Sequence, residues 1–218
     1  MNTMKKAAVI LLCTLFFIAC NDVYTSKKRG YFHIDLPTHQ YRSFNRAGFP
    51  YTFEYPVYAS ITQDSTYFDT KPENDYWVNI DFPQFGAKIY LSYKIIGGKA
   101  NYKIKQPDGS YRDSVGVNVF DLMVNDAFNL TNKNEVVATS IRDSLFRNPF
   151  GVTGISFKVG GNAATARQFF VSDTTHNFLR GALYFNATPN ADSLKPVQDF
   201  LQADVDKLIN SFRWVKPQ

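Results

Sequence analysis

Ser172, Asp173 and His176 are a serine, an acid and a histidine close together in the chain, so they come first in a search for catalysis. A serine nucleophile needs a histidine base, which a carboxylate usually orients. These residues fall between two predicted strands, where serine and aspartate are also common turn residues. The chain has no G-x-S-x-G nucleophile elbow. We therefore predict no catalytic residues, and a hydrolase that uses His176 with Asp173 stays as an alternative.

Residues that could hold a metal or a phosphate also lack the required spacing. His33 and His39 are six positions apart, which matches no zinc motif. Gly160-Gly161-Asn162 lies between predicted strands rather than before a helix, so it is interpreted as a tight turn. Acids in the first half lack the spacing of a calcium loop; they are Glu54, Asp69, Glu73, Asp75 and Asp81. We predict no metal and no cofactor.

Cys20 is the residue with the most specific predicted chemistry. Lys5 and Lys6 precede an apolar run over residues 7–18, and Ala19 is a small residue before a possible cut. This pattern is typical of a secretory signal peptide, and the run is shorter than the roughly 20 residues of a membrane-spanning helix. A cut before Cys20 resembles a bacterial lipobox, in which the cysteine receives lipid. We predict a signal peptide over 1–19, a lipidated tether over 20–29 and one domain over 30–218.

Composition limits what this domain can be. Removing the signal peptide leaves about 200 residues with a charge of about +3, enough for one sizeable core. No basic stripe or motif indicates nucleic-acid binding; Lys27-Lys28-Arg29 is either a contact to lipid headgroups or a solvated part of the tether. Cys13 leaves with the signal and Cys20 carries lipid, so no disulfide remains. Burial of aromatic residues, with 20 Phe and 13 Tyr in the chain, must stabilise the fold.

Alternating side chains predict strands. Residues 76–82 and 88–95 each alternate apolar and polar positions around a short loop at 84–87 with Gly86, which predicts a hairpin. Residues 50–56 are predicted as the first strand, after an extended lead-in segment at 31–37. The polar residues 97–114 are predicted as a loop or flap.

Helical spacing appears twice. Residues 119–130 carry a Phe/Met stripe with Asn118 as the predicted N-cap, and residues 194–212 form a wider apolar face with Asp192 or Ser193 as cap. Trp214 is expected to seal the end of this last helix. Between the helices, an antiparallel meander is predicted; its strands are 136–146, 151–159, 167–172 and 178–186. The predicted class is α+β, an antiparallel sheet with a central and a C-terminal amphipathic helix packed on it.

Several aromatic residues are predicted to lie on the surface. Trp77 and Tyr90 fall opposite the apolar faces of their strands, and Tyr102 and Tyr111 lie in the predicted flap. Exposed Trp and Tyr are enriched where proteins meet partners. A second helix covering this face is the alternative.

Ordered segments along most of the mature chain resemble the gliding-motility-associated lipoprotein GldD family of the Bacteroidota. The segments are residues 29–37, 51–56, 77–83, 89–94, 160–164, 168–170, 176–186 and 189–194. His33, the extra Asn177 and a longer loop at 99–117 depart from the family pattern. The Tyr-Pro near the first predicted strand and the closing Ser211-Phe212 after the last helix also resemble the Mog1/PsbP-like α/β/α sandwich.

The resemblance implies a membrane-anchored, non-catalytic accessory lipoprotein of gliding motility and the type IX secretion system. Its partners would be other gliding and secretion envelope proteins, and its membrane contact the lipid on Cys20. Asn21-Asp22-Val23-Tyr24 lacks a run of acids, which favours a periplasmic face; the choice of inner or outer membrane stays open. A periplasmic binding module for peptidoglycan or another cell-wall ligand is the second hypothesis, and an envelope hydrolase is the third.

Overall fold

The structure is a computed structural model that describes residues 34–63, 72–186 and 191–215. The described residues from Asp35 onward belong to one compact unit. The predicted signal peptide, Cys20 and the tether lie outside the described residues.

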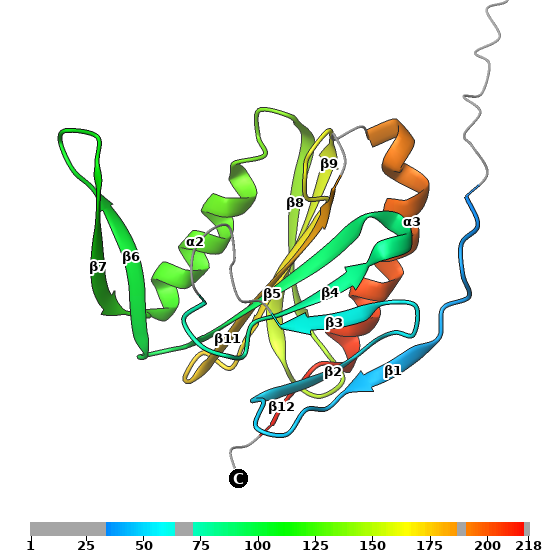
Figure 1. Ribbon diagram of the computed structural model, residues 1–218, viewed down its shortest axis with the longest axis horizontal. Coiled ribbons are helices and arrows are strands. Elements are labelled where there is room, and N and C mark those ends of the chain that lie inside the picture. The colour runs from blue at the N-terminus through cyan, green and yellow to red at the C-terminus, as the bar shows by residue number, and fades with distance from the viewer. Residues whose placement is uncertain (1–33, 64–71, 187–190, 216–218) are drawn as a thin grey trace, which may run out of the picture. The chain divides into compact units, whose positions relative to one another are not determined.

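A seven-stranded antiparallel sheet forms the centre of this unit (Figure 1). In spatial order its strands are β3 (Ser60–Gln63), β4 (Val78–Phe82), β5 (Ala87–Ile95), β11 (Asn177–Phe185), β10 (Arg167–Ser172), β9 (Thr153–Gly161) and β8 (Ala138–Arg147). Every neighbouring pair is antiparallel. This topology confirms the predicted α+β class and the predicted meander in the second half.

The predicted hairpin is formed by β4 and β5. Pro83–Phe85 makes one turn of 3-10 helix, and Gly86 follows in the left-handed region at φ 55°, which glycine adopts without steric cost. The strands then pair with Val78 opposite Leu91. Ile89 and Leu91 are almost fully buried, as the alternation predicts, whereas Ile95 at the strand end is exposed.

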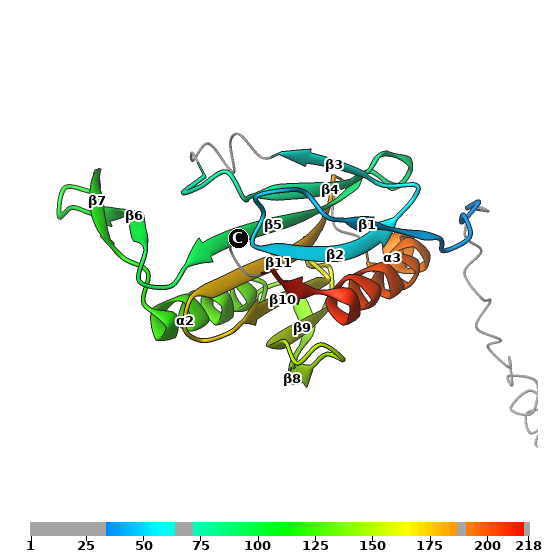
Figure 2. The same cartoon turned by 90° about the horizontal axis from the view of Figure 1, so that it is seen from below.

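The two helices cover opposite faces of the sheet. Phe170 of β10 packs with Met123 of α2 (Phe120–Asn132). Arg167, an odd number of residues away, points to the other face, where it contacts Asp206 of α3 (Ala191–Ser211). Figure 2 shows the helices on either side of the central strands.

The C-terminal helix is held by its apolar face, as its spacing predicts. The buried residues along it and just after it are Val197, Leu201, Val205, Leu208, Ile209 and Phe212. Each such side chain contributes about 1.5–3 kcal/mol relative to an exposed one. The helix begins at Ala191, so the predicted caps Asp192 and Ser193 lie inside its first turn.

A second, three-stranded sheet lies against α3. It consists of β2 (Tyr51–Pro56) between β1 (Tyr41–Phe44) and β12 (Arg213–Trp214). The predicted first strand is therefore the second, because the short β1 carries no clear alternation. Trp214 does pack on Phe212, with ring centroids 4.8 Å apart, and it also pairs with Tyr51 in the sheet.

The segment predicted as a loop at 97–114 is instead a projecting hairpin of β6 (Lys99–Lys105) and β7 (Tyr111–Val117). Its alternation is hard to see because one face mixes the lysines of β6 with the apolar residues Tyr111, Val115 and Val117 of β7. The predicted turn at Pro107-Asp108-Gly109 does connect the strands, with Gly109 at φ 84°. Asn118 does not cap α2: the N-cap position is Val119, which makes no side-chain cap bond.

Candidate functional site

Ser172, Asp173 and His176 do lie on one turn, between β10 and β11, but their side chains hold the turn together. Asp173 Oδ1 accepts the backbone N–H groups of Thr175, His176 and Asn177 at 2.8–3.0 Å. Ser172 Oγ donates to the Asn177 carbonyl at 2.7 Å and accepts from the Thr174 N–H. The local sequence folds this way because Asp and Ser side chains readily satisfy turn amides.

The His176 ring is not positioned by Asp173. Its Nδ1 lies 3.0 Å from Thr175 Oγ1, and the residue is exposed. Partial burial raises the pKa of the Asp173 carboxyl, but the hydrogen bonds from Asn177, His176 and Thr175 outweigh this and leave the pKa below its usual value. The arrangement is that of a braced turn, as interpreted from the sequence.

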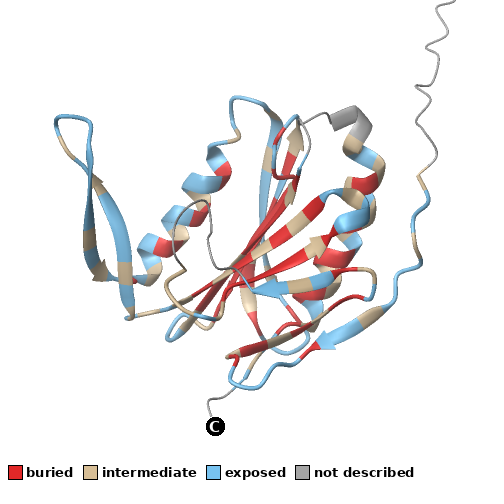
Figure 3. Ribbon diagram, in the orientation of Figure 1, coloured by how far each residue is buried: buried red, intermediate tan, exposed pale blue. Residues whose placement is uncertain are grey.

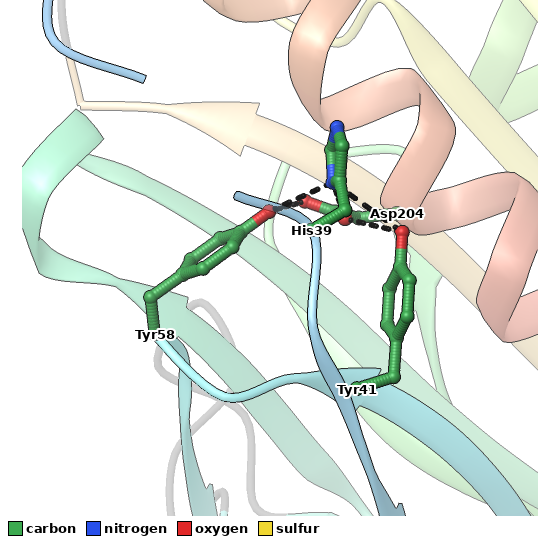
Figure 4. Close-up of polar contacts among 4 residues, drawn as sticks. All are labelled: His39, Tyr41, Tyr58 and Asp204. Atoms are coloured by element: carbon green, nitrogen blue, oxygen red, sulfur yellow. Dashed lines mark hydrogen bonds and ion pairs between the residues drawn. The ribbon is translucent and has the colours of Figure 1, made fainter. Parts of the chain in front are cut away.

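A second polar cluster lies where the chain enters the domain (Figure 4). The carboxylate of Asp204, on α3 and almost fully buried, accepts hydrogen bonds from three side chains. His39 Nδ1 lies 2.8 Å and the Tyr41 hydroxyl 3.0 Å from Oδ1, and the Tyr58 hydroxyl lies 2.5 Å from Oδ2. The His39 ring also stacks on Phe200 at a centroid distance of 4.2 Å.

This Asp204 cluster ties three segments to α3. They are the stretch just before β1 through His39, β1 itself through Tyr41, and the turn between β2 and β3 through Tyr58. Burial and the neighbouring Asp204 carboxylate raise the pKa values of Tyr41 and Tyr58, so both phenols stay protonated as donors. The second ring nitrogen of His39 points away from the other three residues (Figure 4). The cluster acts as an anchor for the start of the domain, because side chains from three segments together satisfy one buried carboxylate on α3.

Sequence reasoning missed this cluster, although one signal was present. Asp204 falls within the apolar stripe of the last helix, beside Leu201, Val205 and Leu208. A carboxylate on a buried helical face must find hydrogen-bond donors. The pattern indicates that partners exist, but not which ones.

The predicted aromatic surface is only partly formed. Trp77 is 8% exposed and its Nε1 donates to the Tyr93 carbonyl at 2.7 Å, so the prediction of an exposed indole is wrong. Trp77 precedes the first residue of β4, where strand alternation does not apply. Tyr90 is half-buried and packs edge-on against Tyr184 at 5.5 Å.

Tyr102 and Tyr111 are exposed, at 48% and 64%, on the hairpin. Tyr102 lies opposite Ser114 in the register, an odd number of positions from Tyr111, so the two rings point to opposite faces. Val115 and Val117 share the face of Tyr111, and the apolar exposure continues into the start of α2. We define the hairpin surface as the exposed apolar side chains on the Tyr111 face and at the start of α2; they are Tyr111, Val115, Val117, Val119 and Leu122. Figure 3 shows this hairpin largely exposed, in contrast to the central strands.

The base of the hairpin is fixed by polar contacts. The Asn118 side-chain amide donates to Glu73 Oε2 at 3.1 Å, and Glu73 Oε1 pairs with Lys94 of β5 at 2.8 Å. The Asn118 backbone bonds both Gly97 and Gly98. These contacts tie both ends of the hairpin to the central sheet.

Within the described parts of the chain, no three His, Cys, Asp or Glu side chains gather as possible metal ligands. Among the helices that the structure describes, none has the length and apolarity to cross a membrane.

Taken with the sequence, the described geometry is that of an α+β domain that projects an apolar hairpin. A family model described as gliding motility lipoprotein GldD matches residues 21–214. The chain belongs to this family of gliding motility lipoproteins, as the resemblance predicted. Family membership implies a lipid-anchored location in the cell envelope.

The comparison with curated proteins gave no match. Among solved structures, the chain is similar to the solution structure of cyanobacterial PsbP (CyanoP) from Synechocystis sp. PCC 6803. The identity is 12% and the TM-score 0.41, covering 83% of this chain and 95% of that chain.

Proposed function

We propose that this lipoprotein is a non-catalytic accessory subunit of the gliding motility and type IX secretion machinery. It acts through protein–protein contacts in the cell envelope, with the hairpin surface as its principal contact. Lipid on Cys20 holds it at a membrane, and the domain faces the periplasm.

The hairpin surface carries this proposal. Among the described strands, β6 and β7 pair only with each other, and an isolated two-stranded hairpin is marginally stable in water. Val115 and Val117 are nevertheless about 60% exposed on one face, beside Tyr111. Apolar and aromatic side chains gathered on a projecting element are typical of a surface that a partner covers.

The polar rim of the same hairpin supports a protein partner. Lys99, Lys103 and Lys105 lie on the face of Tyr111 and Val115, by the alternation along the register. Exposed cations around an apolar centre resemble the rim and core of a protein interface. The lysines favour a partner with acidic groups at its own rim.

Photocross-linking in intact cells tests the proposal. A photoreactive amino acid replaces Tyr111, and a matched control replaces Lys195 on α3, whose side chain is 64% exposed. We expect motility and secretion proteins among the products from position 111 and not from position 195. Equal products from both positions would contradict a specific contact, and cross-links to glycan fragments alone would favour the peptidoglycan-binding alternative.

A pair of substitutions adds a functional readout. Val115→Asp places a charge on the hairpin surface, whereas Leu145→Asp makes the same kind of change at a 79% exposed site on β8. We expect Val115→Asp to impair gliding and secretion and Leu145→Asp to leave both intact. If His176→Ala impaired both while Val115→Asp did not, the enzymatic alternative would replace this proposal.

A further inference from the structure

A small polar pocket lies on the α3 face of the sheet, away from the hairpin surface. Its volume is about 180 Å³, and it lies between strands β8–β10 and the last turns of α3. The residues that give it its chemistry are Arg147, Ser156, Lys158, Arg167, Asp206 and Asn210.

Arg167 is a buried cation with unused donors. It is 5% exposed, and its Nη2 pairs with Asp206. Its Nε and Nη1 are buried without a hydrogen-bond partner among the described residues. Burial lowers the pKa of the guanidinium, and the Asp206 carboxylate opposes this effect. A buried charged group with unpaired donors is costly, so these N–H groups indicate an absent acceptor.

Ser156 supplies a second unpaired group in the same pocket. It is also 5% exposed, and its Oγ has no partner among the described residues. Lys158 lies two residues further along β9 and directly opposite Arg167 in the register, so all three side chains share one face. A buried hydroxyl and guanidinium, together with a lysine, therefore line one small space.

The charge and size of the pocket define its ligand. Arg147, Lys158 and Arg167 line it against the single carboxylate of Asp206, so the lining favours an anion. The volume is below the 300–1,000 Å³ of a pocket for drug-sized ligands. Phosphate has several acceptor oxygens that can take charge-assisted hydrogen bonds from donors on different strands.

We propose that this pocket binds a phosphate group. Arg167 and Lys158 supply the charge, and Ser156 donates a hydrogen bond to a phosphate oxygen. The phosphate is either a free ion or the ester of a larger envelope molecule, such as a lipid headgroup. The site is independent of the hairpin surface and of the accessory role proposed above.

Calorimetric titration of the full-length protein in detergent tests the site, with inorganic phosphate as the probe at constant ionic strength. We expect saturable binding at one site. Lys158→Gln should weaken it about tenfold, the usual effect of losing one charged hydrogen bond. Arg142→Gln is the matched control, because Arg142 is the exposed cross-strand neighbour of Lys158 and does not line the pocket. It should bind as the native protein does.

Ser156→Ala gives a second variant that removes one buried hydroxyl and leaves the strand intact. We expect weaker phosphate binding and a preserved unfolding transition. Absent or unsaturable phosphate binding would overturn the proposal, since the buried donors would then be satisfied by water. A loss of affinity in Arg142→Gln equal to that in Lys158→Gln would overturn it too, because the binding would then depend on surface charge alone. Glycerol phosphate separates the two sources: tighter binding than inorganic phosphate identifies an ester, and equal or weaker binding identifies the free ion.

Discussion

At the scale of single residues, the start of the domain depends on one buried carboxylate, Asp204, whose donors come from distant segments. Asp204 accepts from Tyr58 at 2.5 Å and from Tyr41 at 3.0 Å, across 146 and 163 positions of the chain. Each hydrogen bond to a charged group is worth about 1.5–3 kcal/mol. The Asp204 cluster therefore stabilises the start of the domain.

Tyr58→Phe should lower the free energy of unfolding by about 1.5–3 kcal/mol, because the Asp204 carboxylate loses one donor and stays buried. Urea denaturation measures the change. Tyr111→Phe is the control, since Tyr111 is 64% exposed on the hairpin. Equal stability of the two variants would mean that water replaces the Tyr58 hydroxyl without cost.

Asp173 gives a prediction for acidic pH. The pKa of its carboxyl is depressed in the folded protein. The ionised carboxylate therefore adds to the free energy of unfolding at pH values above its unfolded-state pKa of about 3.9, and this stabilisation is lost as pH falls through the folded-state pKa. Asp173→Ala should cost about 1–2 kcal/mol at pH 7. The difference in stability between Asp173→Ala and the native protein, measured by thermal unfolding, should become smaller below about pH 4. A difference that stays constant down to pH 2 would contradict the assigned role of the charge.

At the scale of elements, close contacts between strands restrict the sequence. Gly181 of β11 lies opposite Phe169 of β10. A Cβ at position 181 would lie 2.3 Å from two carbons of the Phe169 ring, which is itself almost fully buried. Glycine is required at this position because the ring fills the space above it.

Gly181→Ala should therefore destabilise the protein by about 1–3 kcal/mol through overpacking. Chemical denaturation of the single variants and of Gly181→Ala with Phe169→Leu measures the coupling. The two changes should cost less together than the sum of the single costs, because leucine leaves room for the methyl group. Additive costs would show that the strain lies elsewhere.

The contacts at the base of the hairpin lead to a separate prediction about the local stability of β6 and β7. Glu73 bonds both Asn118 and Lys94, so it links the hairpin to β5. Glu73→Ala should speed amide exchange in β6 and β7 while the central strands stay protected, because the hairpin has few other attachments. Mass spectrometry of hydrogen exchange measures this. Lys195→Ala, which breaks a surface ion pair with Asp199, is the control and should leave the hairpin unchanged.

At the scale of the whole molecule, the proposed role combines a lipid anchor with a domain that meets other proteins. Two acyl chains or their equivalent are needed for stable membrane attachment, and the domain offers the hairpin surface and the phosphate pocket on different elements. Under this proposal, the lipidated N-terminus sets the position at the membrane, and the domain sets the specificity for partners.

Cys20→Ala should release the protein from the membrane fraction and abolish gliding, because the proposed lipid anchor is attached to this cysteine. Fractionation and immunoblotting measure the distribution. A Cys13→Ala variant is the control and should stay membrane-bound. A Cys20→Ala protein that remains attached and functional would show that anchoring does not require this cysteine.

Local patterns in the sequence determined several elements without further information. The β4–β5 hairpin follows from period-two alternation around Gly86, and α3 follows from an apolar stripe that includes Leu201 and Leu208. The turn after Ser172 follows from Asp173 and its neighbours. These features are formed by residues a few positions apart, so their energetics are contained in short segments of sequence.

Only the tertiary structure decided which faces are covered and which buried polar groups meet. Trp77 is buried, and the Tyr93 carbonyl satisfies its indole N–H; the sequence alternation carries no information about that contact. Asp204 meets His39 across 165 positions, and Arg167 of β10 pairs with Asp206 of α3 while two of its donors find no partner among the described residues. A strand's period assigns each side chain to a face, but the covering layer comes from elements far away in the chain. The candidate surfaces for binding are therefore properties of packing rather than of sequence.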